Sequence, residues 1–593
     1  MKEIEPYLLV VLARKFESIT TEMNNALLRA ARSNVMATAR DFSCSVTDQS
    51  HRIVCVAGGN ANHVVGSGLV ARVIPELHDD IRPGDAFLNN SPYYGNNHHA
   101  DWTISVPVFY EGEHIFTANA RAHQADCGNS QPTTYSPFAK DIYEEGALDF
   151  PCVRIQRDYK DIEDLIRMCR VRIRVPDQWY GDYLAMIGAA RVGERRIIEL
   201  CNRYKADTVK VFAEQWQEYG KRRMMEEIRK LPKGTWTGEA KHDPVPGVAD
   251  SGITVRLKMT IDHDKGRIIL DFTDSDDAVP GGYNMSEGSI VPASSTGVLN
   301  NLDPTLPKNE GVFGCIERKL RKNCVTGIVE VPTCASVATT NVAGRMVNLV
   351  QSMFAELGKD RGMAEGSLGM AVTMSVISGF DWRTKRPYVN QLIQGTMGGP
   401  GLFGHDGWIT YNLPEAGGTL MVDSIEVNEQ KYPIIWDESE LIPDSEGAGK
   451  WRGAPGVRSI IRQRHDPGVW AYTCDGHFFP ADGIHGGQAG RPSDAWKFGR
   501  VKKERIDLPL ISYQVITPDE AIVSESGGGG GFGDPSERDP DKVRWDVIEG
   551  FITIEKARQV YGVVLKAGPE RYVVDDKATK ELRSKLKKKG NKN

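Results

Sequence analysis

Two short stretches of the chain share the pattern His-x-Ala-Asp, and both carry side chains that can bind a metal ion or transfer a proton. They are His98–Asp101 and His123–Asp126. Imidazole nitrogens and carboxylate oxygens are ligands of divalent ions such as zinc, manganese and iron. Four of the 13 histidines lie between positions 98 and 123. This density predicts a polar cleft that supports metal or acid–base chemistry.

The segment between the two copies has the pattern of a β-hairpin. Residues 102–110 and 114–120 are rich in strand-forming side chains, and Glu111-Gly112 supplies the turn. Symmetric pairing around that turn puts Asp101 beside Ala122 and brings both His-x-Ala-Asp copies to the open end of the hairpin. Ligands that are distant in sequence would therefore converge. The alternative is that these side chains only cap the strand ends or face solvent.

Other patterns predict the elements that support this hairpin. Apolar residues recur at helical spacing in residues 5–32, and residues 41–56 alternate as a second hairpin with Asp41 at its open end. Residues 162–204 have the pattern of two helices separated by Pro176. We interpret these helices as scaffold.

Changes in composition divide the 593 residues into four predicted regions. The fold class that follows is α+β, a multidomain chain with a hairpin-rich N-terminal part. The regions are an N-terminal metal-site and helical region (1–230), a β-rich then helical middle domain (231–380), a glycine-rich β domain (381–520), and a last region with a glycine-rich loop, a C-terminal helix and a basic tail (521–593). The basic tail is expected to be a solvated, poorly ordered end.

Two glycine-rich stretches raise the question of phosphate binding. The run Gly527–Gly531 fits a flexible linker, and the alternative is a set of backbone amides that cradles an anion. Gly447–Lys450 is superficially similar to a phosphate-binding loop, but Trp451 follows where Ser or Thr would contact magnesium. The sequence therefore predicts that ATP binds elsewhere.

Overall composition excludes several classes of protein. Lys and Arg total 73 against 79 Asp and Glu, a net charge of −6, which argues against a nucleic-acid partner. The ten cysteines form no C-x-x-C pair, and no apolar run is long enough to span a bilayer. No basic segment followed by a cleavable apolar stretch is present near the first residue. We expect a cytoplasmic protein with no membrane partner.

Eight motifs, in a fixed order, resemble those of the hydantoinase B/oxoprolinase family. The resemblance runs from about residue 5 to residue 565. Its motifs are Arg40–Cys44, Gly84–Tyr93, His98–Asp101, Arg121–Asp126, Val175–Gln178, Arg191–Arg196, Pro443–Gly453 and Gly529–Pro535.

This resemblance implies the B-type subunit of an ATP-dependent hetero-oligomer. The implied partner is a hydantoinase A-like subunit that binds ATP and magnesium and phosphorylates a small-molecule substrate. Family members open cyclic amides such as hydantoins, 5-oxoproline and lactams, whereas related subunits carboxylate the ketones acetone and acetophenone. A length near that of free-standing hydantoinase B chains favours hydrolysis of a cyclic amide. A ketone carboxylase subunit and a non-catalytic scaffold are the alternatives.

The resemblance also implies a set of metal ligands, which the hairpin pairing gathers independently except for one carboxylate. Two imidazoles and two carboxylates suit zinc, manganese or iron. The implied ligands are Asp41, His98, Asp101 and His123. Asp126, from the second copy of the pattern, joins the candidate catalytic residues. His99 competes with His98 as the ligand and otherwise would orient it.

Two positions depart from the family pattern. Ser91 stands where many members have an aspartate before Pro-Tyr, and this removes a carboxylate near the site. Val64 stands where a histidine is expected, and His63 is displaced from that position by one residue. We expect the substrate chemistry to have diverged accordingly.

Overall fold

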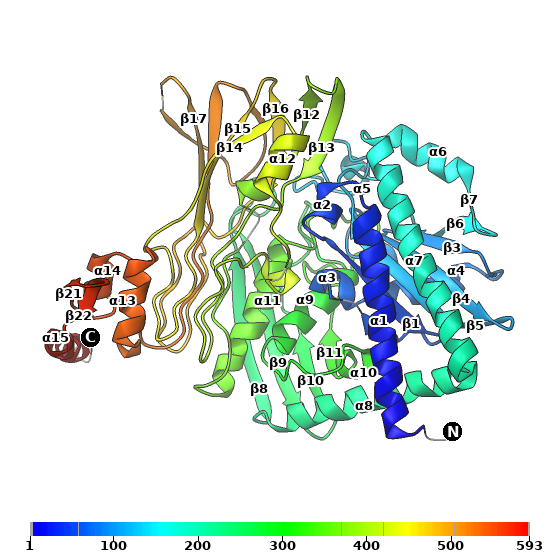
Figure 1. Ribbon diagram of the computed structural model, residues 1–593, viewed down its shortest axis with the longest axis horizontal. Helices are drawn as coiled ribbons and strands as arrows, with labels where there is room; N and C mark the ends of the chain where they lie inside the picture. Colours follow the sequence, from blue (N-terminus) through cyan, green and yellow to red (C-terminus); the bar gives the residue numbers. More distant parts are fainter. Residues whose placement is uncertain (1–3, 57, 369–370, 419, 503, 591–593) are drawn as a thin grey trace.

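The computed structural model describes residues 4–590 apart from 57, 369–370, 419 and 503. Within these residues the chain forms five β-sheets with helices around them, as Figure 1 shows. The predicted α+β class is confirmed. Among the described helices, none has both the length and the apolar character needed to cross a bilayer.

The N-terminal part is built on a seven-stranded sheet with strand order β2-β1-β5-β4-β3-β6-β7. Both predicted hairpins, the first helix and the helix break at Pro176 are confirmed. The strands are β1 (Phe42–Asp48), β2 (Ile53–Val56), β3 (Ala86–Asn89), β4 (Asp101–Tyr110), β5 (Glu113–His123), β6 (Val153–Arg157) and β7 (Lys160–Asp161). The helices are α1 (Pro6–Ala30), α2 (Asn34–Ala37), α3 (Ala61–Val64), α4 (Ser67–Leu77), η1 (Pro92–Tyr94), α5 (Ile142–Glu145), α6 (Glu163–Arg172), α7 (Pro176–Tyr204) and α8 (Ala206–Arg229).

This sheet has one apolar face and one polar face, and both are buried. The even-numbered residues 102–108 of β4 and 116–122 of β5 are apolar and share a core with α1 and α7, which cover that face in Figure 1. Side chains alternate along a strand, so the odd-numbered residues 101–105 and 117–123 lie on the opposite face. They are polar and almost fully buried. Asp101 and His123 therefore share this polar face.

The register of the hairpin differs by one residue from the predicted pairing. Asp101 pairs with His123 rather than with Ala122, because a β-bulge between Val108 and Phe109 shifts the register. The turn lies at Glu111-Gly112 as predicted, and both residues have positive φ. The bulge therefore places Asp101 and His123, two candidate metal ligands, directly opposite each other.

The remaining chain adds four sheets and a shared core. The second sheet is β11-β10-β9-β8, the third β13-β12-β16-β19, the fourth β14-β15-β20-β17-β18 and the last β21-β22. The strands are β8 (Gly234–His242), β9 (Ile253–Asp262), β10 (Arg267–Asp271), β11 (Ile316–Lys319), β12 (Val376–Asp381), β13 (Arg386–Gln391), β14 (Ile434–Leu441), β15 (Val457–Gln463), β16 (Gly468–Thr473), β17 (Asp494–Gly499), β18 (Arg505–Asp507), β19 (Ile511–Ile516), β20 (Glu520–Glu525), β21 (Leu565–Gly568) and β22 (Arg571–Val574).

Helices join these sheets, and the packing is continuous between the regions predicted from composition. One hydrophobic core combines Ile53 and Val64 with Met346 and Ile511. The helices are α9 (Glu287–Leu299), α10 (Glu310–Phe313), α11 (Asn341–Met353), η2 (Phe354–Leu357), η3 (Val372–Met374), η4 (Pro414–Ala416), α12 (Ile425–Lys431), η5 (Pro535–Glu537), α13 (Pro540–Ile548), α14 (Ile554–Gln559) and α15 (Asp576–Gly590).

Four glycine-rich segments lie side by side between the fourth sheet and α13, where Figure 1 shows long irregular stretches of chain. We call residues 398–401, 447–456, 483–491 and 527–532 the glycine bundle. Its backbone groups bond from one segment to the next: the Gly447 amide donates to the Gly529 carbonyl at 2.8 Å, and the Gly529 amide donates to the Ala454 carbonyl at 3.0 Å. Most of these glycines leave no room for a Cβ atom.

This arrangement overturns both interpretations of Gly527–Gly531. The run is buried, so it is not a flexible linker. It also does not cradle an anion, because each of its amides already donates a hydrogen bond: that of Gly527 to the Ser493 hydroxyl, and the others to carbonyl oxygens of neighbouring segments. The interior of this part of the molecule therefore consists of packed main chain instead of packed side chains.

Substituting a bundle glycine is expected to destabilise the protein strongly. A Cβ at Gly529 would lie 2.0 Å from the Gly399 carbonyl oxygen, so Gly529→Ala must separate two hydrogen-bonded segments. We expect a loss of at least about 3 kcal/mol in the free energy of unfolding. Gly499→Ala is the control, because a Cβ at Gly499 meets nothing within 4 Å. Urea denaturation followed by circular dichroism measures both; equal midpoints would contradict the packing described.

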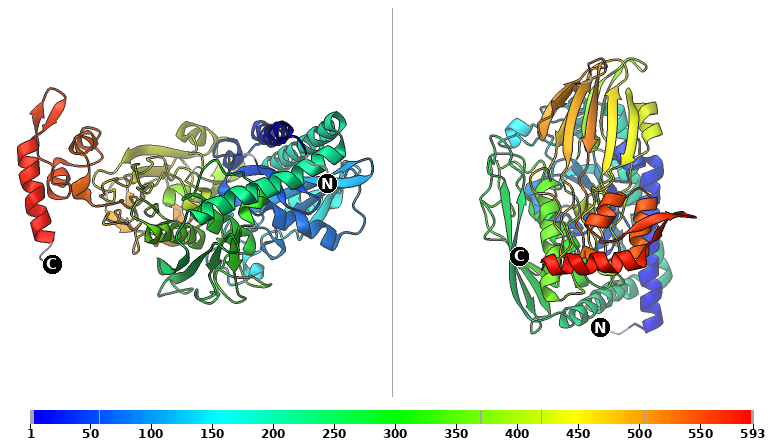
Figure 2. Two further views of the ribbon diagram at one scale, coloured as in Figure 1. Left: turned by 90° about the horizontal axis from the view of Figure 1, so that it is seen from below. Right: turned by 90° about the vertical axis from the view of Figure 1, so that its left-hand side faces the viewer.

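The basic tail is more ordered than expected. It forms α15, which Figure 2 shows with β21 and β22 at one end of the long axis. The Arg583 guanidinium donates to the backbone carbonyls of Tyr561 (3.0 Å) and Arg538 (2.6 Å), and burial lowers the pKa of Arg583. Lys577, Lys580 and Lys585 are exposed, in line with a solvated end, but the expectation of a poorly ordered end is wrong for residues 576–586; Lys592 lies outside the described residues.

Candidate metal centre

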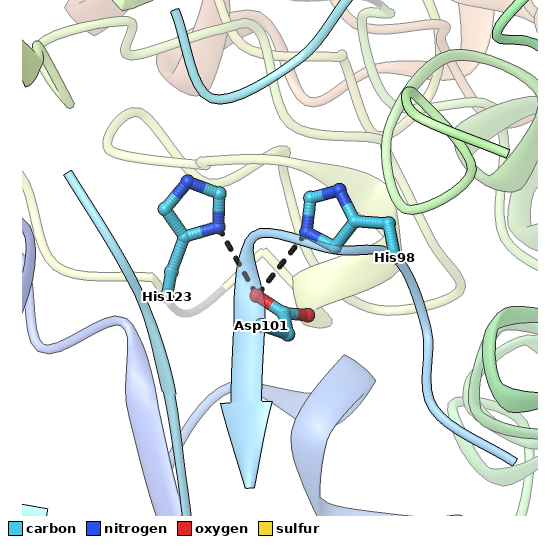
Figure 3. A group of neighbouring side chains, drawn as sticks. All are labelled: His98, Asp101 and His123. Carbon is cyan, nitrogen blue, oxygen red and sulfur yellow. Dashed lines mark hydrogen bonds and ion pairs between the residues drawn. The ribbon is translucent and has the colours of Figure 1, made fainter. Parts of the chain in front are cut away.

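Three side chains converge at the open end of the β4–β5 hairpin. Asp101 is the first residue of β4, His123 is the last residue of β5, and His98 lies in the turn before β4 (Figure 3). The Asp101 Oδ1 atom lies 3.2 Å from His98 Nε2 and 3.1 Å from His123 Nδ1. Two ligands that bind one ion at about 2.1 Å and at right angles are about 3.0 Å apart. The spacing therefore fits three ligands of one cation.

The hydrogen bond on the far side of His98 fixes which ring nitrogen faces the centre. Nδ1 lies 2.8 Å from the backbone carbonyl oxygen of Ser336, an acceptor, so Nδ1 carries the hydrogen. In the neutral ring Nε2 then has the lone pair that a metal ion needs, and it makes no hydrogen bond. Metal-binding histidines typically have this second interaction, which orients the ring and makes the ligating nitrogen more basic.

The charge balance at the centre favours an ionised Asp101. Burial alone would raise the pKa of this carboxyl group, but the imidazoles of His63 and His98 and the hydrogen bond to His123 hold it well below its usual range. Burial alone would lower the pKa of His98, but Asp101 raises it. A raised pKa means that Nε2 of His98 binds a proton more readily. A divalent ion would compete with this proton for Nε2, so metal binding should weaken as the pH falls.

Asp41 and His63 complete the polar group. Asp41 precedes β1 and is held by the Asn60 amide, which donates to its Oδ1 at 2.7 Å. The His63 Nε2 atom lies 3.2 Å from Asp101 Oδ2 and 3.6 Å from Asp41 Oδ1, so it sits between the two carboxylates. The sequence showed His63 only as a displaced residue. Its place on the short helix α3, packed against β1, brings it into the centre.

These residues surround a cavity of about 30 Å³. Room of this size holds one or two water molecules or an ion. The cavity is lined by Asp41, His63, His98, Asp101 and His123 together with uncharged side chains. The ring atoms His63 Nδ1, His98 Nε2 and His123 Nε2 are buried without a hydrogen bond. Such unpaired nitrogens are costly in a folded protein and fit a site that receives a ligand.

Two candidate residues from the sequence lie elsewhere. His99 points away from the cluster, with Nδ1 3.0 Å from Glu145 Oε2. The Asp126 carboxylate pairs with Arg174 at 3.0 Å, accepts the Gly128 amide, and does not line the cavity. Of the adjacent histidines, the structure thus brings His98 to the centre and gives His99 a buried ion pair.

Substituting the two neighbouring histidines should separate metal binding from stability. We expect His98→Ala to lose most of the bound metal and His99→Ala to keep most of it, because only His98 Nε2 faces Asp101. Elemental analysis of the two purified variants measures the difference. A larger metal loss in His99→Ala would transfer the ligand role to His99.

The His99 pair should also make stability depend on pH. Burial alone would lower the pKa of His99, but Glu145 and Asp149 raise it to about 10. A pKa above the unfolded value of about 6.5 gives stability that is complete below pH 6.5 and is lost as the pH rises through 10. His99→Ala should therefore cost about 3 kcal/mol near pH 6, with a smaller cost at pH 9 to 10. Urea titrations at several pH values test this; a cost that grows with pH would contradict it.

Comparison with known proteins places the whole chain in one group. The family model described as hydantoinase B/oxoprolinase matches residues 5–535. Among curated proteins, the caprolactamase subunit beta of Pseudomonas jessenii is 29% identical over 590 residues, which cover 98% of this chain and 99% of that protein.

Solved structures give the same result. The ATP-dependent caprolactamase of Pseudomonas jessenii superposes with a TM-score of 0.87 at 27% identity, covering 98% of this chain and 100% of that chain. A nucleotide-free acetone carboxylase superposes with a TM-score of 0.89 over 99% of this chain and 84% of that chain, but at 18% identity it shows a shared fold alone. The family match extends over most of the sequence and includes every residue of the candidate metal centre. This chain therefore belongs to the hydantoinase B/oxoprolinase family.

Proposed function

We propose that this chain is the hydrolytic subunit of an ATP-dependent enzyme that opens a small cyclic amide. The observation that carries the proposal is the buried His98–Asp101–His123 cluster in a chain that matches the family along most of its length. The similar caprolactamase is ATP-dependent and its name supports a lactam as the compound opened here, while the family's name, hydantoinase B/oxoprolinase, supports a hydantoin or 5-oxoproline.

We assign Asp41, His98, Asp101 and His123 as ligands of a divalent ion, either zinc, manganese or iron. Bound at these residues, the ion would acidify a water molecule or polarise a carbonyl oxygen. The chain supplies the ordered surroundings: Ser336 orients His98, and Asn60 holds Asp41. His63 lies where it would extend the ligand set. Asp126 has no part in this proposal, because its carboxylate is held by Arg174.

The chemistry requires a second subunit. In the proposed reaction a hydantoinase A-like partner, which binds ATP and magnesium, transfers the terminal phosphoryl group of ATP to the amide oxygen. Water then attacks the ring carbon, the ring C–N bond breaks, and a second water releases phosphate. The products are the ring-opened amino acid, ADP and phosphate. Burial of the centre protects the activated intermediate from unproductive hydrolysis.

A ketone carboxylase subunit is the second candidate, because the fold is shared with acetone carboxylase. Product analysis separates the two. The complex is incubated with ATP, magnesium and either a panel of hydantoins, 5-oxoproline and lactams, or acetone and acetophenone with ¹³C-bicarbonate. We expect a ring-opened amino acid by mass spectrometry. Incorporation of ¹³C into a ketone would replace amide hydrolysis with carboxylation.

A further inference from the structure

We propose that a second cavity beside the metal centre binds the phosphorylated form of the substrate, an inference that rests on the proposed function. This cavity has a volume of about 700 Å³, within the range of small-molecule sites. It is formed by α1, the segment before α3, α3 itself, α9, the turn before α10 and the segment after η4. We call it the vestibule.

The vestibule and the metal cavity share part of their walls. Asn60 and Leu420 line both cavities, and both side chains are buried. The Asn60 side-chain amide donates to Asp41 while its oxygen accepts the Asn62 amide. A ligand in the vestibule is thus separated from the metal centre by two side chains.

The charges in the vestibule favour an anion. Among the described residues that line it are Arg40 and Lys308 but no aspartate or glutamate. Both side chains are exposed, and within the part of the chain that the structure describes neither takes part in an ion pair. Unpaired cations in a cleft raise the local concentration of anions. A guanidinium also matches the oxygens of a phosphate group with two parallel hydrogen bonds. Arg40 lines the vestibule and directly precedes the proposed ligand Asp41 in the chain.

The rest of the lining combines uncharged polar side chains with apolar ones that suit a small hydrocarbon group; the polar ones are Thr21, Asn24, Asn25, Asn60, Thr296 and Asn300. Phe42, Val64, Val65, Leu299 and Phe313 contribute apolar surface. Apolar walls with a few polar groups are typical of sites that bind small molecules. The combination of two cations and these walls selects a phosphate ester of a small ring, which is the chemical form that the partner would deliver.

Direct binding to the purified chain tests the site without requiring turnover. The probe is phenyl phosphate, a stable ester with an apolar ring, measured by isothermal titration calorimetry. We expect Arg40→Gln and Lys308→Gln each to weaken binding about tenfold, because each removes a charged hydrogen bond to the phosphate. Arg29→Gln is the control: Arg29 is exposed on α1 and does not line the vestibule. Equal affinities in all four proteins would overturn the inference.

Two further measurements keep the result unambiguous. Ala61→Met places a longer side chain in the vestibule and should abolish binding although both cations remain. In the complete complex, the Arg40→Gln/Lys308→Gln variant should keep its metal and still consume ATP, but form less product per ADP. An unchanged product-to-ADP ratio would overturn delivery through the vestibule. If phenyl phosphate binding depends on both cations while no amide is opened, the anion site stands and the proposed function fails.

Discussion

Asp101→Asn is expected to remove both the bound metal and the partner-dependent activity. The substitution keeps the size of the side chain but removes the charge that faces three imidazoles, two of which are proposed ligands. We expect metal content to fall from about one ion per chain to a small fraction, and turnover to fall at least about 100-fold. Elemental analysis and product formation with the partner measure the two effects.

Asp126→Asn is the matched variant, because Asp126 has the same residue type and equal burial but pairs with Arg174. It should retain the metal and lose only stability. Equal metal content in the wild type and Asp101→Asn would contradict the proposed metal site. A wild-type protein that contains no metal would favour a non-catalytic scaffold subunit, in which the cluster only holds the fold.

The isolated chain is expected neither to hydrolyse ATP nor to open a cyclic amide, and both activities should appear on addition of the partner. An amide at neutral pH resists attack, because its resonance and its poor leaving nitrogen both oppose the tetrahedral intermediate. Phosphorylation of the oxygen removes that obstacle. Release of ADP and of ring-opened product is measured for each subunit and for the mixture, with magnesium and ATP present throughout.

The structure explains why no nucleotide site is expected in the glycine-rich segment at Gly447–Lys450. The Gly447 amide bonds to the Gly529 carbonyl and the Lys450 amide to the Gly533 carbonyl, so neither is free for a phosphate. The Lys450 ammonium group lies 3.5 Å from Glu537. ATP hydrolysis by the isolated chain would contradict the proposed division of labour.

The parts of the site that follow from local sequence pattern were predictable. Strand alternation and the Glu111-Gly112 turn place Asp101 and His123 near each other without any knowledge of tertiary structure. The bulge at Val108 was not predictable, because no residue type there requires it. The place of His63 in the site was also not predictable, since it depends on how α3 packs against β1.

The glycine bundle was missed for a different physical reason. Sequence patterns report mainly which side chains are buried, and glycine has none, so a buried backbone layer has the composition of a linker. The same limit applies to the tail. Its charges predict solvation, but the stabilising contacts of Arg583 are hydrogen bonds to carbonyl oxygens, which any sequence offers.

The glycine bundle constrains the order in which the chain can fold. Its segments are separated by long stretches of sequence, and glycine loses more backbone freedom on ordering than other residues, so the bundle is a poor nucleus. The fourth sheet removes this obstacle: β15 begins at Val457 directly after one segment, and β20 ends at Glu525 just before another. Once β15 and β20 have paired, the two bundle segments next to them already lie side by side. The remaining hydrogen bonds of the bundle can then form outward from the sheet. Since β20 is the central strand of that sheet, the bundle is expected to form only after residues 520–532 have joined the fold.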